Sequence, residues 1–217
     1  MSKPTANGVP GDHTLDRMPP VRSGLGILGG TFDPPHIGHL AAAVEVRSSL
    51  DLDRVLLVVA NEPWQKVGTR PFSLAADRFA LTMAAAEGLE GIAASDREIV
   101  RGGLTYSIDT LLELRQEEPD EELFLIVGAD AATSLHTWHR HEELPELATL
   151  VIVDRLGDSR AEVPAGWRIE RVTMPRLDVS SSDVRSRAAD GRSLAPYVTP
   201  AVVDEISRRG LYGLSDS

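Results

Sequence analysis

The sequence predicts an α/β fold of the Rossmann-like, doubly wound type, in which helices cover both faces of a mainly parallel sheet. Two observations support this prediction. From residue 23 onward, short apolar runs alternate with longer helical stretches, as in chains built from strand-helix-strand units. The runs themselves, such as LFLIV and TLVIV, have no polar alternation, and continuous apolar strands are typical of a parallel sheet that is covered on both faces.

The expected elements follow one another along the chain. Strands are expected at 25–28, 54–60, 123–127, 149–153 and 168–173, and helices at 37–50, 73–87, 106–118, 182–189 and 201–209. In the first helix, Leu40, Val44 and Leu50 are expected to share a buried face. Ser107 is the expected N-cap of the third helix, and Pro200 stands where the last one begins, a position that favours proline.

Length and composition bound the organisation of the chain. At 217 residues, of which 42% are hydrophobic and 25% charged, it is expected to form a single domain over residues 23–217. Residues 1–22 contain four prolines and no apolar segment, so a disordered tail is expected there. The absence of cysteine excludes disulfides, thiolate metal sites and a cysteine nucleophile.

The charge balance and the apolar runs disfavour two classes of partner. With 22 basic and 33 acidic residues the formal net charge is −11, which disfavours sequence-independent binding to nucleic acid or to anionic lipid. No apolar run approaches the roughly 18 residues that span a bilayer. We therefore expect no nucleic-acid and no membrane partner, and a cytoplasmic location. A homo-oligomer is compatible with the sequence.

The residues that indicate chemistry are concentrated after the first strand, in the segment GGTFDPPHIGH at 29–39. Gly29 and Gly30 permit a tight turn and a close approach of the backbone to a ligand. His36 and His39 then lie three residues apart at the start of a helix, where free backbone N–H groups and the helix dipole favour an anion. This combination predicts a phosphate site.

A dinucleotide-binding fingerprint in the same region is discounted. Gly24, Gly26 and Gly29 spell G-x-G-x-x-G, but that motif must follow a strand, and here its spacer residues are themselves the strand. No G-x-x-x-x-G-K-[ST] sequence is present either. A dehydrogenase and a P-loop enzyme are therefore disfavoured.

The segment 29–39 contains a sequence that resembles the HxGH motif of the nucleotidyltransferases. Over all of its positions, the segment is similar to the corresponding segment of the bacterial nicotinate-nucleotide adenylyltransferases. A second segment, VSSSDVR at 179–185, resembles the late serine-rich motif of the same family. The likeness extends from residue 25 to residue 212. It implies an adenylyltransferase with His36, His39, Lys66 and Arg185 acting on the phosphates.

The resemblance also implies two binding sites. For ATP it implies Gly29, Gly30, Thr31, Phe32, Gly128, Asp130, Ser181 and Ser182. For the second substrate it implies Asn61, Thr105, Tyr106, Ser107 and Trp138, with the tryptophan against a pyridine ring and the amides at 106–107 on a carboxylate. Core packing is the alternative role for Trp138. The chain departs from the family at Gln65, where histidine is usual.

The reaction implied is transfer of AMP from ATP to nicotinate mononucleotide. A phosphate monoester with a second pKa near 6 is already ionised at neutral pH and needs no general base. Mg²⁺ is expected to arrive with ATP rather than in a protein site. Nicotinamide mononucleotide as acceptor, phosphopantetheine or cytidylyl transfer, and a non-catalytic nucleotide sensor are the alternatives. An aminoacyl-tRNA synthetase is disfavoured because the chain is short and acidic.

Overall fold

The computed structural model describes residues 24–63, 72–156 and 163–214. The expected tail at 1–22 lies outside the described residues, and so do Gln65 and Lys66. Among the described residues, no helix is long and apolar enough to cross a bilayer.

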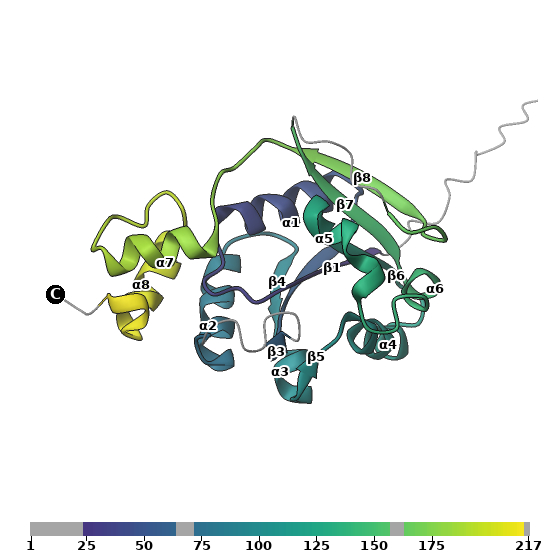
Figure 1. Cartoon of the computed structure of the whole chain (residues 1–217), viewed down its shortest axis with the longest axis horizontal. Helices are drawn as coiled ribbons and strands as arrows, with labels where there is room; N and C mark the ends of the chain where they lie inside the picture. The colour runs from purple at the N-terminus through teal and green to yellow at the C-terminus, as the bar shows by residue number, and fades with distance from the viewer. Residues whose placement is uncertain (1–23, 64–71, 157–162, 215–217) are drawn as a thin grey trace, which may run out of the picture.

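Six parallel strands form the central sheet (Figure 1). They are β1 (Gly24–Gly30), β2 (Arg54–Val59), β4 (Ile92–Ser95), β6 (Glu122–Gly128), β7 (Thr149–Arg155) and β8 (Ile169–Met174). Their spatial order is β4-β2-β1-β6-β7-β8, which in chain order is the 3-2-1-4-5-6 arrangement of doubly wound nucleotide-binding folds. The predicted fold class is confirmed. A separate two-stranded ladder pairs β3 (Glu62–Pro63) with β5 (Leu104–Thr105).

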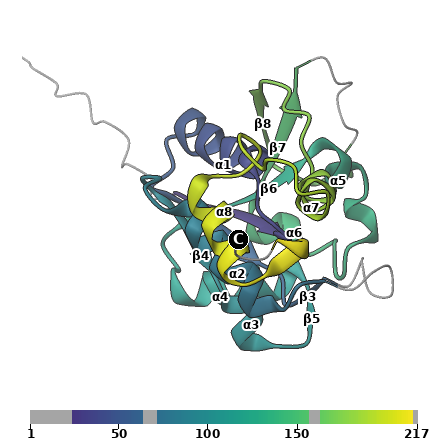
Figure 2. The ribbon, with the colours of Figure 1, turned by 90° about the vertical axis from the view of Figure 1, so that its left-hand side faces the viewer.

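Helices cover both faces of the sheet. They are α1 (Ile37–Ser49), α2 (Ala75–Ala86), α3 (Arg97–Arg101), α4 (Ser107–Glu117), α5 (Ala129–Thr133), α6 (Leu144–Leu147), α7 (Ser181–Ala189) and α8 (Pro200–Arg208), with short 3-10 turns at Leu135–Thr137 and Leu211–Gly213. One apolar cluster joins α1, α2, α7 and α8 to one face, and a second joins α4, α5 and α6 to the other. Figure 2 shows α7 and α8 together in front of the sheet.

The structure corrects three details of the prediction. Strand β4 was not predicted, because its sequence IAAS has no run of large apolar side chains. Ser107 is not the N-cap of α4: Tyr106 holds that position, in extended conformation, and Ser107 is the first helical residue. In α1 the buried face consists of Leu40, Ala43 and Val46, whereas Val44 is 43% exposed.

The order of the strands determines where a ligand site can form. From β1 the chain continues to β2 on one side of the sheet, and from β6 it continues to β7 on the other side. The direction in which strands are added therefore reverses between the neighbours β1 and β6. In open α/β sheets, ligands bind outside the carboxyl ends of the strands at such a switch point. The segment after β1 therefore begins at the favoured place. The structure also explains the glycines of the discounted fingerprint: a Cβ on Gly26 would lie 2.8 Å from the side chain of Val55.

Candidate active site

A cavity of about 270 Å³ opens at this switch point. Its walls come from the ends of β1, β6, β7 and β8, from the first turns of α1, and from the segment before α7. The residues that line it are Leu28, His36, Gly38, His39, Ala42, Val127, Gly128, Val153, Arg155, Met174, Leu177, Val179 and Ser180. The structure thus brings both motif histidines, Gly128 and the start of the second motif to one cavity.

His36 is the N-cap of α1 and is buried. Its ring stacks on that of His39 with 3.7 Å between centroids. Gly38 makes this possible, because a Cβ there would lie 3.1 Å from the His36 ring and 3.3 Å from Val179. Burial, aided by the positive charge of Arg155, lowers the pKa of His36 to about 4. At neutral pH His36 is therefore uncharged and offers hydrogen bonds rather than a charge to a ligand.

The backbone fixes the tautomer of His39. Its Nδ1 accepts a hydrogen bond of 3.2 Å from the backbone N–H of His36, so the proton of the neutral ring lies on Nε2. The ring is held between His36 and the edge of Phe32, whose centroid is 5.0 Å away. An oriented Nε2–H at a helix start is a suitable donor to a phosphate oxygen.

The second motif docks on the first. The Ser181 hydroxyl donates to the carbonyl of Pro34 at 2.8 Å, and Arg185 donates to the carbonyl of Asp33 at 2.6 Å and to the Ser182 hydroxyl at 2.9 Å. Residues about 150 positions apart thus form one surface. The side chain of Ser180 caps α7 by accepting from the backbone N–H of Asp183. Arg185 is not among the residues that line the cavity; its guanidinium binds the carbonyl of Asp33, in the turn after β1.

Two buried charges support the turn after β1. The Asp33 side chain, 1% exposed, accepts a 2.7 Å hydrogen bond from the Tyr212 hydroxyl. Arg78 in α2, also 1% exposed, donates to the carbonyls of Thr31 at 2.8 Å and Ala60 at 2.6 Å. Burial lowers the pKa of Arg78, and the charge of Asp33 opposes that shift. The ends of β1 and β2 are therefore held together by one guanidinium.

The predicted acceptor side begins where β2 ends. The backbone N–H of Asn61 donates to the Thr105 hydroxyl at 3.0 Å, and its side-chain amide donates to the carbonyl of Gly103 at 2.9 Å. Arg78 donates to the carbonyl of Asn61 at 2.8 Å, which connects this group to the turn after β1. The Tyr106 ring lies 4.3 Å from that of His139. Asn61, Thr105, Tyr106 and Ser107 thus lie together at the start of α4.

The remaining predicted residues have distinct surroundings. Trp138 is partly buried against the second apolar cluster, and its Nε1 has no hydrogen-bond partner among the described residues. Asp130 lies exposed in the first turn of α5. Phe32 is buried, and its ring fills the space above Gly30, where a Cβ would lie 2.8 Å from it. A packing role for the Phe32 side chain therefore accompanies the backbone role that the resemblance implies.

Three contributing residues were missed from the sequence. Arg155 ends β7 and lines the cavity; the signal was a cation directly after a buried strand. Arg78 occupies the apolar face of α2 together with Leu81 and Ala85, and an arginine within an apolar stripe could have identified it. The third is Glu98 in α3, which is buried and accepts a hydrogen bond from Thr110 in α4; the sequence around it contains no comparable signal.

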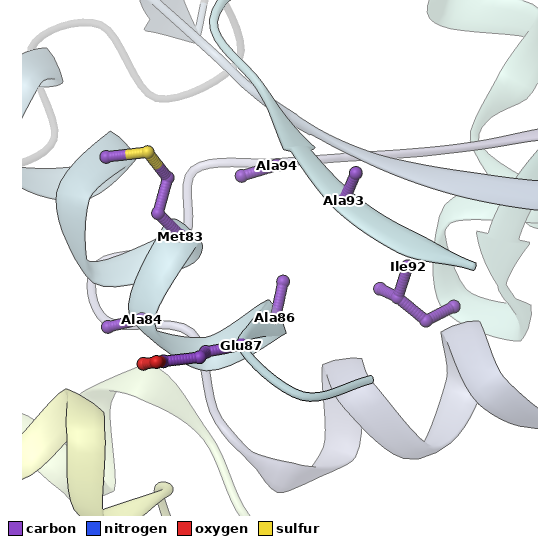
Figure 3. Close-up of a pocket in the computed structure, with 7 residues that line it drawn as sticks. All are labelled: Met83, Ala84, Ala86, Glu87, Ile92, Ala93 and Ala94. Carbon is purple, nitrogen blue, oxygen red and sulfur yellow. The ribbon is translucent and has the colours of Figure 1, made fainter. Parts of the chain in front are cut away.

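A second cavity, of about 410 Å³, lies on the surface between α2 and β4 (Figure 3). Its lining is Met83, Ala84, Ala86, Glu87, Ile92, Ala93 and Ala94. The one charged group among these is a carboxylate, which repels an anion. The smaller cavity at the switch point is therefore the candidate nucleotide site. Within the described residues, no group of three or more histidine, aspartate or glutamate side chains is arranged to hold a metal ion.

The buried imidazole of His36 makes stability depend on pH. Its pKa falls from 6.5 in the unfolded chain to about 4 in the native protein, so below pH 6.5 the unfolded chain binds the extra proton. The His36 contribution is full above pH 6.5 and is lost as pH falls toward 4. Between pH 7 and 5 we expect a loss of about 2 kcal/mol in the free energy of unfolding.

Urea unfolding at both pH values, for the wild type and His36→Asn, measures this loss. The variant should lose about 2 kcal/mol less than the wild type over that interval. His136→Asn, which changes an exposed histidine, serves as the control and should follow the wild type. Equal losses in the wild type and His36→Asn would contradict the assignment.

Comparison with known proteins places these features in a family. The model described as cytidylyltransferase-like matches residues 27–187. A protein of Frankia casuarinae named probable nicotinate-nucleotide adenylyltransferase is 47% identical over 189 residues, covering 85% of this chain and 98% of the relative. A protein of Thermus thermophilus with the same name is 42% identical over 188 residues, covering 87% and 98%.

Solved structures show the same fold. The nicotinic acid mononucleotide adenylyltransferase of Plasmodium falciparum, complexed with NaAD, superposes with a TM-score of 0.72 over 89% of this chain and 99% of its own. The two sequences are 17% identical. At this level of sequence identity the solved structure shows that the fold is shared, whereas the relatives of 42–47% identity show the family.

Proposed function

This chain belongs to the nicotinate-nucleotide adenylyltransferases of the cytidylyltransferase-like family, and from that premise we propose how its residues divide the work. The enzyme transfers the adenylyl group of ATP to nicotinate mononucleotide in NAD biosynthesis. An oxygen of the acceptor phosphate attacks the α-phosphorus of ATP. The bond to the bridging oxygen breaks, and pyrophosphate leaves. We place this reaction in the cytoplasm, where ATP is at hand.

The observation that carries the proposal is the cavity at the switch point, where two stacked histidines meet the second motif. Because the acceptor phosphate is already ionised, the protein has to align the reacting groups and neutralise charge on the leaving side. His39 Nε2–H is the proposed donor to the phosphates, and His36 holds its ring in place. Arg155 adds a positive charge to the same cavity, and Arg185 keeps the turn at Asp33 in position.

The nucleotide and the acceptor occupy neighbouring parts of the site. Gly29 and Gly128 leave room for the nucleotide at the ends of β1 and β6, because nothing lies within 4 Å of a Cβ placed on either residue. Gly30 instead accommodates the ring of Phe32, and Asp130 is the proposed partner of the ribose hydroxyls. The acceptor lies toward Asn61 and the first turn of α4, whose amides suit a carboxylate. ATP enters as its magnesium complex, because Mg²⁺ bound to phosphates keeps most of its waters and needs few protein ligands.

The test of this function is pyrophosphate release with ATP and Mg²⁺. Nicotinate mononucleotide, nicotinamide mononucleotide and phosphopantetheine are offered in parallel, and the product is identified by chromatography. Preference for the nicotinate substrate supports the proposal. Comparable use of the amide removes the role given to the α4 amides, and ATP binding without product formation indicates a nucleotide sensor.

Trp138→Ala is expected to raise the KM for nicotinate mononucleotide by about 10- to 100-fold, because stacking of a ring on an aromatic side chain contributes roughly 1–3 kcal/mol. The KM for ATP should change by less than about threefold. Trp167→Ala is the matched control, since Trp167 packs against the same apolar cluster. It should lower stability and leave both KM values unchanged. Equal increases in the two KM values of Trp138→Ala would indicate a packing role.

A further inference from the structure

The carboxylate of Glu98 lies beneath the start of α4 and is 5% exposed. It accepts a 2.6 Å hydrogen bond from the Thr110 hydroxyl and another from the Thr105 hydroxyl. Thr105 directly precedes Tyr106, the N-cap of α4, and Thr110 lies in the first turns of that helix. One carboxylate therefore holds the chain on both sides of residues 106–107.

Each of the two hydroxyls already accepts a hydrogen bond from another group. Thr105 Oγ1 accepts from the backbone N–H of Asn61 at 3.0 Å, and Thr110 Oγ1 accepts from Arg101 at 3.2 Å. Each therefore has its single proton available to donate, and both protons are directed at Glu98. An ionised carboxylate presents acceptors alone and offers one oxygen to each hydroxyl, whereas protonation turns one of the two oxygens into a donor.

We propose that Glu98 is a positioning residue that aims the amides at the start of α4 at the carboxylate of the acceptor, and so sets the preference for the acid over the amide. The inference rests on the proposed function. Glu98 itself has no contact with substrate in this scheme. It acts through Thr105 and Thr110, which fix the start of α4 to the end of β2 at Asn61.

The charged groups that act on Glu98 are Arg101 on its own helix, at 3.8 Å, and Glu113 on α4. Arg101 also pairs with Glu113 at 2.8 Å. Burial is the largest influence and raises the pKa of Glu98 to about 7, although the hydrogen bonds from the threonines oppose it. A protonated Glu98 has a donor in place of one acceptor. The orientation of the amides at the start of α4 should therefore become less fixed as pH falls through about 7.

The experiment compares kcat/KM for nicotinate mononucleotide with that for nicotinamide mononucleotide. In Glu98→Gln the ratio should fall about tenfold, through a higher KM for the acid, while kcat and the KM for the amide hold. Thr110→Val should reproduce the fall, and Thr110→Ser, which keeps the hydroxyl, should not. Glu117→Gln, at a glutamate of α4 that pairs with Arg97 on the surface, is the control and should match the wild type.

The pH profile of the same ratio is the second readout. Both substrates carry the same phosphate, so its titration cancels, and a nicotinate carboxyl stays ionised across pH 6–8. The wild-type ratio should fall as pH is lowered from 8 to 6, and that of Glu98→Gln should stay flat. Thermal melting confirms that each variant is folded.

Three results would overturn the proposal. An unchanged ratio in folded Glu98→Gln removes the role in selectivity. Equal losses with both acceptors reduce Glu98 to a structural residue. Neither result affects the adenylyltransferase activity. If the wild type releases no pyrophosphate with either acceptor, the proposed function fails first, and the inference fails with it.

Discussion

His39→Ala is expected to lower kcat by about 10²- to 10³-fold, the usual cost of removing one oriented donor to a developing charge. The KM for ATP should rise only a few-fold, because the glycines at the ends of β1 and β6 still receive the nucleotide. The physical reason lies in the tautomer, because the 3.2 Å hydrogen bond from the backbone N–H of His36 occupies Nδ1 and leaves the proton of the neutral ring on Nε2. Single-turnover and steady-state rates at saturating ATP measure the effect.

His136→Ala is the control for this measurement, since it removes an exposed imidazole outside the cavity. It should retain the wild-type kcat. The alanine at position 39 also leaves the His36 amide without its side-chain acceptor, so urea unfolding should show a loss of about 1 kcal/mol. An unchanged kcat in His39→Ala contradicts the assignment of His39 as the phosphate donor.

The position of the two histidines at the switch point was predictable because the segment that carries them is local in sequence. The glycines, the two histidines and the start of the helix lie within eleven residues, and the strand before them is largely apolar. A strand followed by a turn and a helix start determines where the side chains point. The elements α1 and β2 were accordingly expected within one residue of the limits that the structure gives them.

The interior supports of the site were not predictable in the same way. Arg78 in α2 acts on carbonyls 17 and 47 residues away, and Glu98 acts on α4 through Thr110. Such contacts depend on how α2, α3 and α4 pack on the sheet, which periodicity does not encode. The ladder of β3 and β5 has two residues in each strand, too few for a pattern to appear.

Arg78 and Glu98 were also hard to predict because they are charged residue types at buried positions. An arginine or a glutamate in an amphipathic stretch is ordinarily interpreted as the solvent face of a helix. At Arg78 and Glu98 the charge is instead buried and paired with backbone carbonyls or hydroxyls. A buried charge is costly unless it is hydrogen-bonded, so each of these residues holds its partners in place. Arg78 does so at the ends of β1 and β2, and Glu98 at β5.

Arg78→Met is therefore expected to destabilise the protein by about 3–5 kcal/mol, because several carbonyls lose a charged hydrogen-bond donor at once. The change leaves the carbonyls of Thr31, Ala60 and Asn61 without this donor and removes a positive charge that acts on the buried Asp33. Since this variant risks unfolding, Arg78→Lys provides the second measurement. It keeps the charge but cannot reach all of the carbonyls, so a loss of about 2 kcal/mol is expected.

Activity separates the role of Arg78 in the site from its role in the fold. In Arg78→Lys, well below its melting temperature, kcat/KM should fall about tenfold for both ATP and the acceptor, because Thr31 belongs to the proposed nucleotide site and Asn61 to the proposed acceptor site. Arg208→Lys, at an exposed arginine paired with Glu205, should change neither stability nor activity measurably. A stability of Arg78→Met within 1 kcal/mol of the wild type would show that the two strand ends hold their positions without the guanidinium. The site would then depend on the sheet alone.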